Sequence, residues 1–248
     1  MAKSLVEMLM DLLYLDNEIW GLYSFSKDIL RDKISQEDMI AWAMEAKNCA
    51  EHYAQKIMEK YHTRDAITIA MKMGLDIQID HSDQEKYWCH DSNNQGYNFQ
   101  SKFALFIPPQ KIILMEDPIK KSKSTFNLLK RESSRLILTN KKGKLVDKRD
   151  IANILLANEI YHYMEGIYEE AIYSRKKKFI LYTIPIVKYK FKLPIRALSK
   201  MGAMAFSWWL NDLSFSPYLL DVFLTYGYHP DTSERIYDEI MMQKQNIT

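Results

Sequence analysis

Glycine and proline, the two residues that most often form turns, are scarce in this chain. There are seven of each among 248 residues, while hydrophobic residues make up 47% of the sequence. An all-β protein needs many turns, and turns draw heavily on glycine and proline, so this composition disfavours a sandwich or a barrel. The apolar fraction is high enough for a substantial folded core. We therefore expect a folded chain in which helices dominate.

Apolar periodicity and capping signals divide the chain into helices around a short β region. They predict helices over residues 4–32, 35–61, 63–74, 118–138, 151–174, 194–213, 217–227 and 231–243. Ser35 with Asp38 and Asp147 with Asp150 are the capping signals of two of these helices, and Gly74 is the stop signal of a third. Alternating or short apolar runs predict strands within residues 75–80, 97–107 and 111–115. We expect one domain over residues 1–248, with a helical amino-terminal region over 1–62 and a helical carboxy-terminal region over 194–248.

Residues 157–165, within one predicted helix, read A-N-E-I-Y-H-Y-M-E. In the zinc-binding sequence H-E-x-x-H, two histidines four residues apart lie on one helix face and bind the metal, while the glutamate activates a metal-bound water. Here Glu159 and His162 keep their positions, but Asn158 stands in place of the first histidine. An amide offers only a carbonyl oxygen, which zinc accepts less readily than an imidazole nitrogen. The helix keeps the spacing of a metallopeptidase motif and lacks one of its ligands.

The order of elements around this helix resembles that of the ImmA/IrrE-type zinc metallopeptidases. In that family, a strand pair precedes H-E-x-x-H, and a later E-x-E-A-N-x-F-A-like helix supplies the third ligand. The later helix here reads R-A-L-S-K-M-G-A-M-A-F-S-W-W-L, in which residues 203–206 correspond to A-N-x-F. This correspondence places Lys200 at the glutamate ligand position and Gly202 at the second acidic position. The resemblance covers residues 66–217.

The resemblance implies an α+β, mostly helical, zincin-like domain with a small β-sheet packed against the motif helix. It implies a site in which Glu159 is the general base, while His162 and Asn158 occupy two metal-ligand positions. The implied cofactor is zinc, and the implied substrate is a protein or peptide. Regulatory cleavage, for example of a repressor, is the activity expected from the family.

Two substitutions oppose metal binding at this site together. A catalytic zinc normally has three protein ligands and a water, whereas Asn158 and Lys200 leave His162 as the one orthodox ligand. We expect the Lys200 ammonium to lie beside Glu159 as a structural ion pair in place of the metal. The chain is therefore interpreted as a degenerate homologue, a pseudoenzyme with a binding or regulatory role that holds zinc or no metal. The alternative is an active zinc-dependent peptidase.

A second E-x-x-H sequence, from Glu59 to His62, offers a different alternative. Two such sequences and two further glutamates form the metal site of ferritin-like di-iron bundles. The predicted strands interrupt a four-helix pattern, however, and favour the mixed fold. Glu165, Glu169 and His229 are further candidate ligands, for which a solvated helix face and a turn are the simpler interpretation.

Charge restricts the class of partner. The formal net charge is +2, so no global basic field indicates nucleic acid, although lysines cluster over residues 120–148 and 176–192. No helix-turn-helix pattern is present, and no apolar run is long enough to span a membrane. We expect a protein or peptide partner without direct nucleic-acid contact or a membrane span, and the sequence leaves the oligomeric state open.

Cysteine content and the amino-terminal sequence indicate a cytoplasmic protein. Cys49 and Cys89 are too few for a disulfide framework, and the first helix carries charges that a signal-peptide core lacks. Aromatic side chains near the carboxy terminus are candidates for a partner surface, although core packing is the simpler interpretation of most of them. They are Trp208, Trp209, Phe215 and Tyr218.

Overall fold

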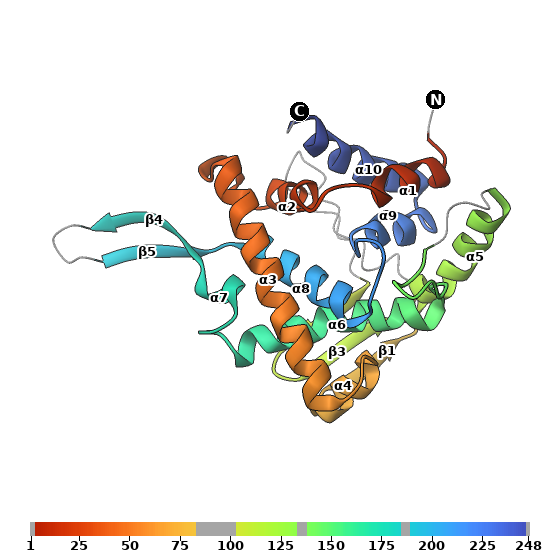
Figure 1. Ribbon diagram of the computed structural model, residues 1–248, viewed down its shortest axis with the longest axis horizontal. Helices are drawn as coiled ribbons and strands as arrows, with labels where there is room; N and C mark the ends of the chain where they lie inside the picture. Colours follow the sequence, from red (N-terminus) through yellow and green to blue (C-terminus); the bar gives the residue numbers. More distant parts are fainter. Residues whose placement is uncertain (1–2, 83–102, 133–137, 185–188, 247–248) are drawn as a thin grey trace.

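The computed structural model describes residues 3–82, 103–132, 138–184 and 189–246, and these form a mostly helical α+β fold (Figure 1). The helices are α1 (Leu5–Leu13), α2 (Asn17–Ser26), α3 (Gln36–Tyr61), α4 (Ala66–Lys72), α5 (Glu116–Glu132), α6 (Lys148–Ile167), α7 (Tyr173–Lys176), α8 (Arg196–Leu210), α9 (Leu219–Tyr226) and α10 (Pro230–Gln245). The strands are β1 (Asp76–Asp80), β2 (Ala104–Ile107), β3 (Lys111–Met115), β4 (Lys178–Ile184) and β5 (Tyr189–Pro194). The fold class predicted from composition and periodicity is confirmed at this level.

The first predicted helix, over residues 4–32, is wrong in its extent. The chain forms α1 and α2 and then a short 3₁₀ turn over Arg31–Lys33. Ser4 starts α1 through a capping box, in which its side chain accepts from the Glu7 amide and the Glu7 carboxylate accepts from the Ser4 amide. At Asp16 the backbone is extended, which begins a new helix and allows α2 to pack on both α3 and α8.

Helix α3 is the longest helix of the described chain, and it begins where the sequence predicts. The Ser35 side chain accepts a hydrogen bond from the Asp38 amide, which satisfies one of the free donors of the first turn. The buried face of α3 is rich in small side chains, and it packs against α8. The alanines of that face are Ala43, Ala46, Ala50 and Ala54. Such small side chains let two helices approach closely.

The predicted small sheet is present and lies against the motif helix α6. Its strand order is β1-β3-β2, with β1 parallel and β2 antiparallel to β3. Within the described residues, β2 pairs with β3 alone and is therefore an edge strand. Both β2 and β3 contact α6. Residues 83–102, which include Cys89 and part of the predicted loop and strand region, lie outside the described residues.

Helix α6 carries residues 157–165 and ends earlier than predicted. Asp147 and Asp150 form the capping box that starts it. The helix ends at Ile167 rather than near residue 174, because the backbone of Tyr168 leaves the helical region. This exit turns Ile172 into the core, where its side chain is fully buried. The next predicted helix also starts later, because Pro194 is the last residue of β5 rather than part of the first turn of α8.

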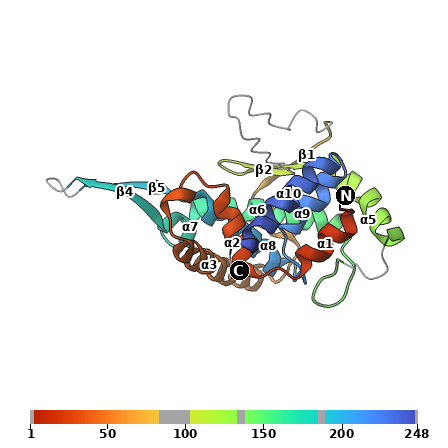
Figure 2. The same cartoon turned by 90° about the horizontal axis from the view of Figure 1, so that it is seen from above.

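Strands β4 and β5 form a second, separate sheet. They pair antiparallel from Lys178↔Pro194 to Ile184↔Tyr189, with a bulge between Ile180 and Tyr182. Figures 1 and 2 show this hairpin extending away from the helices, and we call β4 and β5 the arm. The sequence predicts an extended connection here, but its projection depends on the tertiary structure.

The core surrounds α8, which packs against both α3 and α6. Gly202 of α8 permits the closest approach, because a Cβ atom built there would lie 2.2 Å from the hydroxyl oxygen of Tyr161 on α6. Tyr161 and Phe206 are both fully buried, and their ring centroids lie 5.8 Å apart. No helix in the described parts of the chain has the length and apolar character needed to cross a membrane.

Candidate motif cleft

A cleft of about 610 Å³ lies beside the motif helix, bordered by β2, α6 and α8. We call it the motif cleft. All four residues assigned to the site by sequence line this cleft: Asn158, Glu159, His162 and Lys200. The structure therefore brings the four predicted residues together around one cavity, although their side chains bind different partners.

Asn158, at the first ligand position of the motif, faces α8. Its amide nitrogen lies 3.7 Å from the sulfur of Met204, within a long hydrogen bond to sulfur. Its amide oxygen is buried and has no hydrogen-bond partner in the described structure. This side chain packs between two helices.

Glu159, at the general-base position, is bound to the edge of the sheet. The Phe106 amide donates a hydrogen bond of 2.6 Å to the Glu159 carboxylate. The Met115 amide donates to the Phe103 carbonyl, so Phe103, directly before β2, is hydrogen-bonded across to β3. Because hydrogen-bonded and non-hydrogen-bonded pairs alternate along an antiparallel ladder, the Phe106 amide, three residues on and opposite Ile112, points away from β3. One edge of β2 is thus turned toward the motif cleft, with the Glu159 carboxylate against it.

His162 is held by a buried carboxylate. Its Nδ1 lies 3.0 Å from the Glu165 carboxylate, whose residue is only 1% exposed. Ser174 and Ser199 also donate to Glu165, from α7 and α8 respectively. We call these four residues the Glu165 network. The network connects α6, α7 and α8 through the Glu165 carboxylate. It also fixes the orientation of the partly buried His162 imidazole in the wall of the cleft.

His162 and Glu165 each stabilise the charged form of the other. Burial favours the neutral form of His162, but the Glu165 hydrogen bond and the Glu159 and Glu165 charges outweigh it, so the pKa of His162 is raised. Burial alone would raise the pKa of Glu165, yet the His162 contact and the Ser174 and Ser199 hydrogen bonds lower it. The pair is therefore ionic over a pH range that extends beyond the ordinary pKa values of its two members, 4.5 for the carboxyl group and 6.5 for the imidazole.

Glu165 is the site residue whose place sequence reasoning missed. A solvated face was expected, whereas the side chain is buried. The signal was the helical spacing, because Ala157 and Tyr161 precede Glu165 at intervals of four residues and both are fully buried. A carboxylate in such a stripe must be paired, and here the pairing partner is the histidine of the motif.

Lys200 lines the motif cleft, but the expected ion pair with Glu159 is wrong. The Lys200 ammonium lies 3.1 Å from the Asp221 carboxylate of α9. It also lies 5.6 Å and 5.3 Å from the ring centroids of Tyr23 and Tyr218. The long side chain can reach a carboxylate on another helix, and two aromatic faces favour that position. Its charge is thereby neutralised by α9.

These side chains do not fit a catalytic zinc ion. Such an ion needs three protein ligands and an open position. The described residues contain no group of three or more His, Cys, Asp or Glu side chains that could hold a metal. Asn158 faces Met204 and Lys200 faces Asp221, so neither completes a ligand set with His162. The His162–Glu165 contact is nevertheless the arrangement that orients metal-binding histidines in proteins.

The other candidate ligands lie elsewhere. Glu59 and His62 line a separate, shallow cavity at the end of α3, where His62 adopts a left-handed backbone. Glu169 lies on the exposed turn after α6. His229 is the N-cap residue of α10, and its carbonyl accepts from the Thr232 and Ser233 amides. The mixed fold and the separation of the two E-x-x-H sequences disfavour the di-iron alternative.

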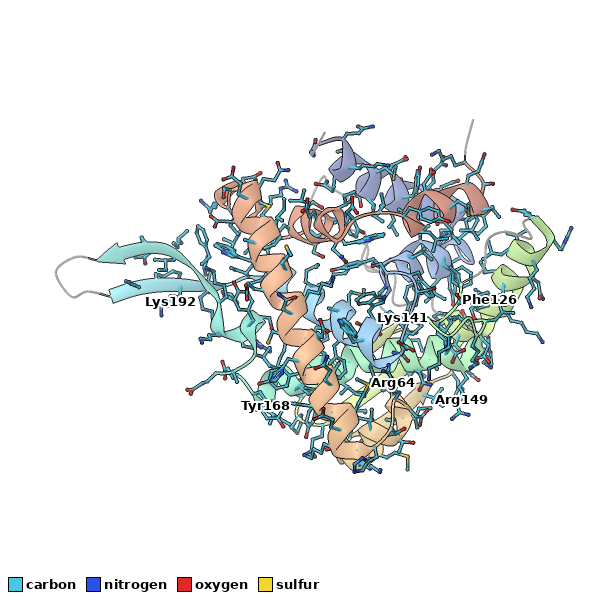
Figure 3. All side chains as sticks on the ribbon, viewed as in Figure 1. Arg64, Phe126, Lys141, Arg149, Tyr168 and Lys192 are labelled. Carbon is cyan, nitrogen blue, oxygen red and sulfur yellow. The ribbon has the colours of Figure 1, made fainter. Side chains whose placement is uncertain are left out.

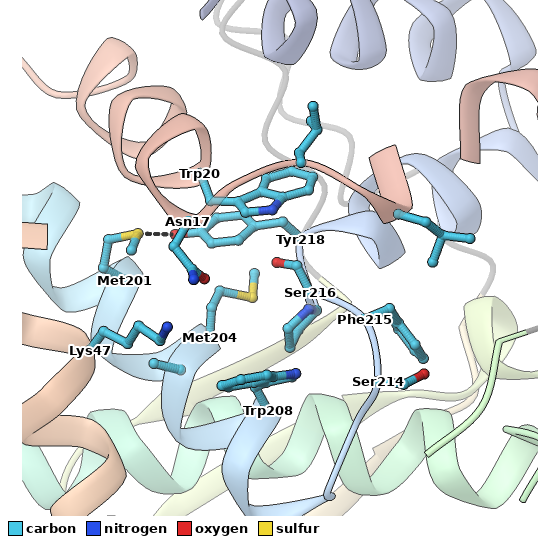
Figure 4. Close-up of a pocket in the computed structure, with 14 residues that line it drawn as sticks. Asn17, Trp20, Lys47, Met201, Met204, Trp208, Ser214, Phe215, Ser216 and Tyr218 are labelled. Carbon is cyan, nitrogen blue, oxygen red and sulfur yellow. Dashed lines mark hydrogen bonds between the residues drawn. The ribbon is translucent and has the colours of Figure 1, made fainter. Parts of the chain in front are cut away.

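A smaller cavity of about 190 Å³ lies on the other side of Met204 (Figure 4). Trp20 and Tyr218 stack in its wall with ring centroids 5.4 Å apart, and Lys47 lies at its side. Phe215 and Tyr218, candidates for a partner surface, are each 2% exposed and belong to the core. Met204 lines both cavities and therefore separates them.

No family model, curated protein or solved structure matches this chain.

Proposed function

We propose that this chain is a metallopeptidase-like protein of the ImmA/IrrE type in which the motif cleft binds a protein segment and performs no hydrolysis. The observation that carries the proposal is the edge of β2, whose Phe106 amide points away from the sheet and into the cleft. An extended peptide can add to such an edge through main-chain hydrogen bonds, while pockets beside it receive side chains.

The cleft supplies both parts of such a site. Strand β2 offers main-chain groups on one side, and α6 and α8 provide side chains on the other. Side chains of both charges line the cavity, among them Arg175, Arg196 and Asp221. A partner segment with both signs of charge fits this lining better than a strongly acidic or basic one.

The same contacts argue against peptide hydrolysis. A general base must reach the attacking water, whereas the Glu159 carboxylate accepts the Phe106 amide. The ligand positions are occupied by an amide that packs on Met204 and by an ammonium paired with Asp221. What is left of the motif, the His162–Glu165 pair, joins α6 to α7 and α8 and supports the wall of the cleft.

Elemental analysis of the purified, dialysed protein tests the absence of metal chemistry. We expect no stoichiometric zinc in the wild-type chain, and zinc in an Asn158→His, Lys200→Glu double variant, which restores two ligands beside His162. An Asn127→His, Lys148→Glu variant makes the same chemical changes at two exposed positions outside the motif cleft and should stay free of zinc. Stoichiometric zinc together with casein hydrolysis in the wild type would instead establish an active peptidase.

Peptide selection tests the binding role. Displayed random peptides are selected on the immobilised wild-type chain, and the affinities of selected peptides are measured by calorimetry. Leu105→Lys in the cleft should weaken binding at least tenfold, whereas Leu145→Lys, at a position 52% exposed elsewhere, should leave it unchanged. Equal affinities for the two variants would show that the peptides bind outside the motif cleft.

A further inference from the structure

Two regions of this chain carry a large excess of positive charge, residues 120–148 and residues 171–211, and the second contains no acidic residue. Residues 171–211 contain nine Lys or Arg residues and neither Asp nor Glu, although the formal net charge of the whole chain is only +2. The expectation of no nucleic-acid contact rested on that overall charge, which averages over the acidic helices elsewhere. The arm formed by β4 and β5 lies within the second region.

The arm also exposes apolar and aromatic side chains. Ile180 is 45%, Tyr182 50% and Phe191 37% exposed. The rings of Tyr182 and Phe191 stack across the two strands, with their centroids 5.2 Å apart and an angle of 2° between their planes. An isolated two-stranded hairpin is marginally stable in water, so side chains of this kind on a projecting hairpin indicate a surface that a partner covers.

The strand register separates these side chains onto two faces. Cross-strand partners share a face, and the pairs Phe179↔Leu193 and Tyr182↔Phe191 therefore form an apolar one, because Phe191 and Leu193 are two residues apart. The bulge between Ile180 and Tyr182 keeps β4 in phase with this face.

Lysines follow the other face of β5. Lys190 and Lys192 alternate with Phe191 and are both exposed (Figure 3 labels Lys192 on the arm). Lys178 is paired with Pro194 on the same face at the base of the arm. Within the described chain, none of these three lysines takes part in an ion pair. Their charges remain available to an anionic partner.

We propose that the arm binds double-stranded DNA as a two-stranded β-ribbon in the major groove. The B-DNA major groove is about 12 Å wide and admits such a ribbon, which the narrow major groove of double-stranded RNA does not. Phe179 and Leu193, at the base of the apolar face, pack against the core, so the exposed Tyr182–Phe191 pair lies toward the base edges. Thymine methyl groups offer apolar contact there, and the lysines reach the phosphates.

Two other anionic or apolar partners fit less well. Within a bilayer, an open hairpin leaves the outer backbone groups of both strands unsatisfied, which costs several kcal/mol for each group. A second copy that paired with β5 along its edge would bring Lys190 and Lys192 close to the same lysines of the first copy, and like charges across a strand pair are destabilising. Duplex DNA satisfies the charge and the shape together.

Fluorescence anisotropy with a labelled duplex of roughly 30 base pairs tests the proposal. At about 100 mM salt we expect a dissociation constant of roughly 1–100 µM for the wild type and weaker binding of the corresponding single strand. A Lys178→Gln, Lys190→Gln, Lys192→Gln variant should bind about tenfold more weakly, and its slope of log affinity against log salt should be shallower by roughly 3.

A matched variant controls for loss of charge alone. Lys123→Gln, Lys130→Gln, Lys142→Gln removes the same three charges from exposed positions outside the arm and should bind as the wild type does. A Tyr182→Thr, Phe191→Thr variant keeps every charge and should also weaken binding, because it removes the apolar contacts. Circular dichroism checks that each variant is folded.

Several results would overturn the proposal. They are no duplex binding at protein concentrations up to roughly 500 µM, several times the weakest expected dissociation constant, equal weakening by the two lysine variants, or tighter binding of the single strand than of the duplex. Arm-dependent sedimentation with phosphatidylserine vesicles, or arm-dependent dimerisation measured by light scattering, would assign the arm to another partner if duplex binding were absent.

Discussion

Replacement of Gly202 by alanine tests whether the contact between α6 and α8 sets the position of the motif helix. An added Cβ would lie 2.2 Å from Oη, 2.4 Å from Cζ and 2.6 Å from Cε1 of Tyr161. These atoms belong to a fully buried ring, so neither the ring nor α8 can move aside without disturbing other core contacts.

The expected cost follows from two opposing effects. Overpacking of a core costs about 1–3 kcal/mol, and an overlap of this size belongs at the upper end. Alanine in place of glycine within a helix raises the free energy of unfolding by about 1 kcal/mol. We therefore expect Gly202→Ala to lower the free energy of unfolding by about 2 kcal/mol, which corresponds to a fall in Tm of about 4–8 °C for a chain of this size.

The matched control is Gly166→Ala. Gly166 also lies in a helix, is exposed, and has no atom within 4 Å of an added Cβ. It should gain about 0.5–1 kcal/mol from helix propensity alone. Urea denaturation followed by tryptophan fluorescence measures both variants, and thermal unfolding by circular dichroism gives the two Tm values.

A double-mutant cycle identifies the cause. In a Tyr161→Leu background the aromatic atoms are gone, so Gly202→Ala should cost less than it does in the wild type. If Gly202→Ala proves as stable as the wild type, or costs the same in both backgrounds, the steric argument is refuted.

Three further predictions concern single interactions. Glu165→Ala should lower the free energy of unfolding by about 3 kcal/mol in urea denaturation, because it leaves His162, the buried Ser174 and the partly buried Ser199 without their shared acceptor. The stabilisation from the Glu165–His162 pair should be complete between their ordinary pKa values, 4.5 and 6.5. It should be lost as the pH falls through the lowered pKa of Glu165 or rises through the raised pKa of His162. A comparison of wild type and Glu165→Gln across this pH range measures the effect, and a constant difference would contradict it. Ser35→Ala should cost about 1 kcal/mol through loss of the α3 cap, whereas no change in thermal unfolding would show that the cap contributes nothing.

Local signals in the sequence predicted the boundaries of several elements correctly. Ser35 and Asp38 marked the start of α3, and Gly74, with a φ of 76°, ends the turn after α4. Asp147 and Asp150 marked the start of α6. In each case the helix boundary is set by residues that lie within a few positions of one another along the chain, so the local sequence is enough to predict it.

The errors came from interactions between distant residues. Lys200 was expected beside Glu159, yet its partner is Asp221, on a helix whose position relative to α8 no local pattern reveals. Glu165 was assigned to solvent because the serines that bind it lie in α7 and α8. The four residues that the resemblance assigned to one site do line one cleft. The partner of each charge was not predictable, because it depends on helix packing.

The hydrogen bond from Phe106 to Glu159 bears on how the protein resists aggregation. An edge strand with open amides is a template on which another chain can add. The carboxylate already accepts one of these amides, so an incoming strand must displace a charged acceptor before it can pair there. A segment that gains only a single backbone contact there does not offset this loss, whereas the partner proposed above would also fill the cleft. On that proposal, Glu159 would raise the affinity that a chain needs before it can pair with β2, a role that requires no metal.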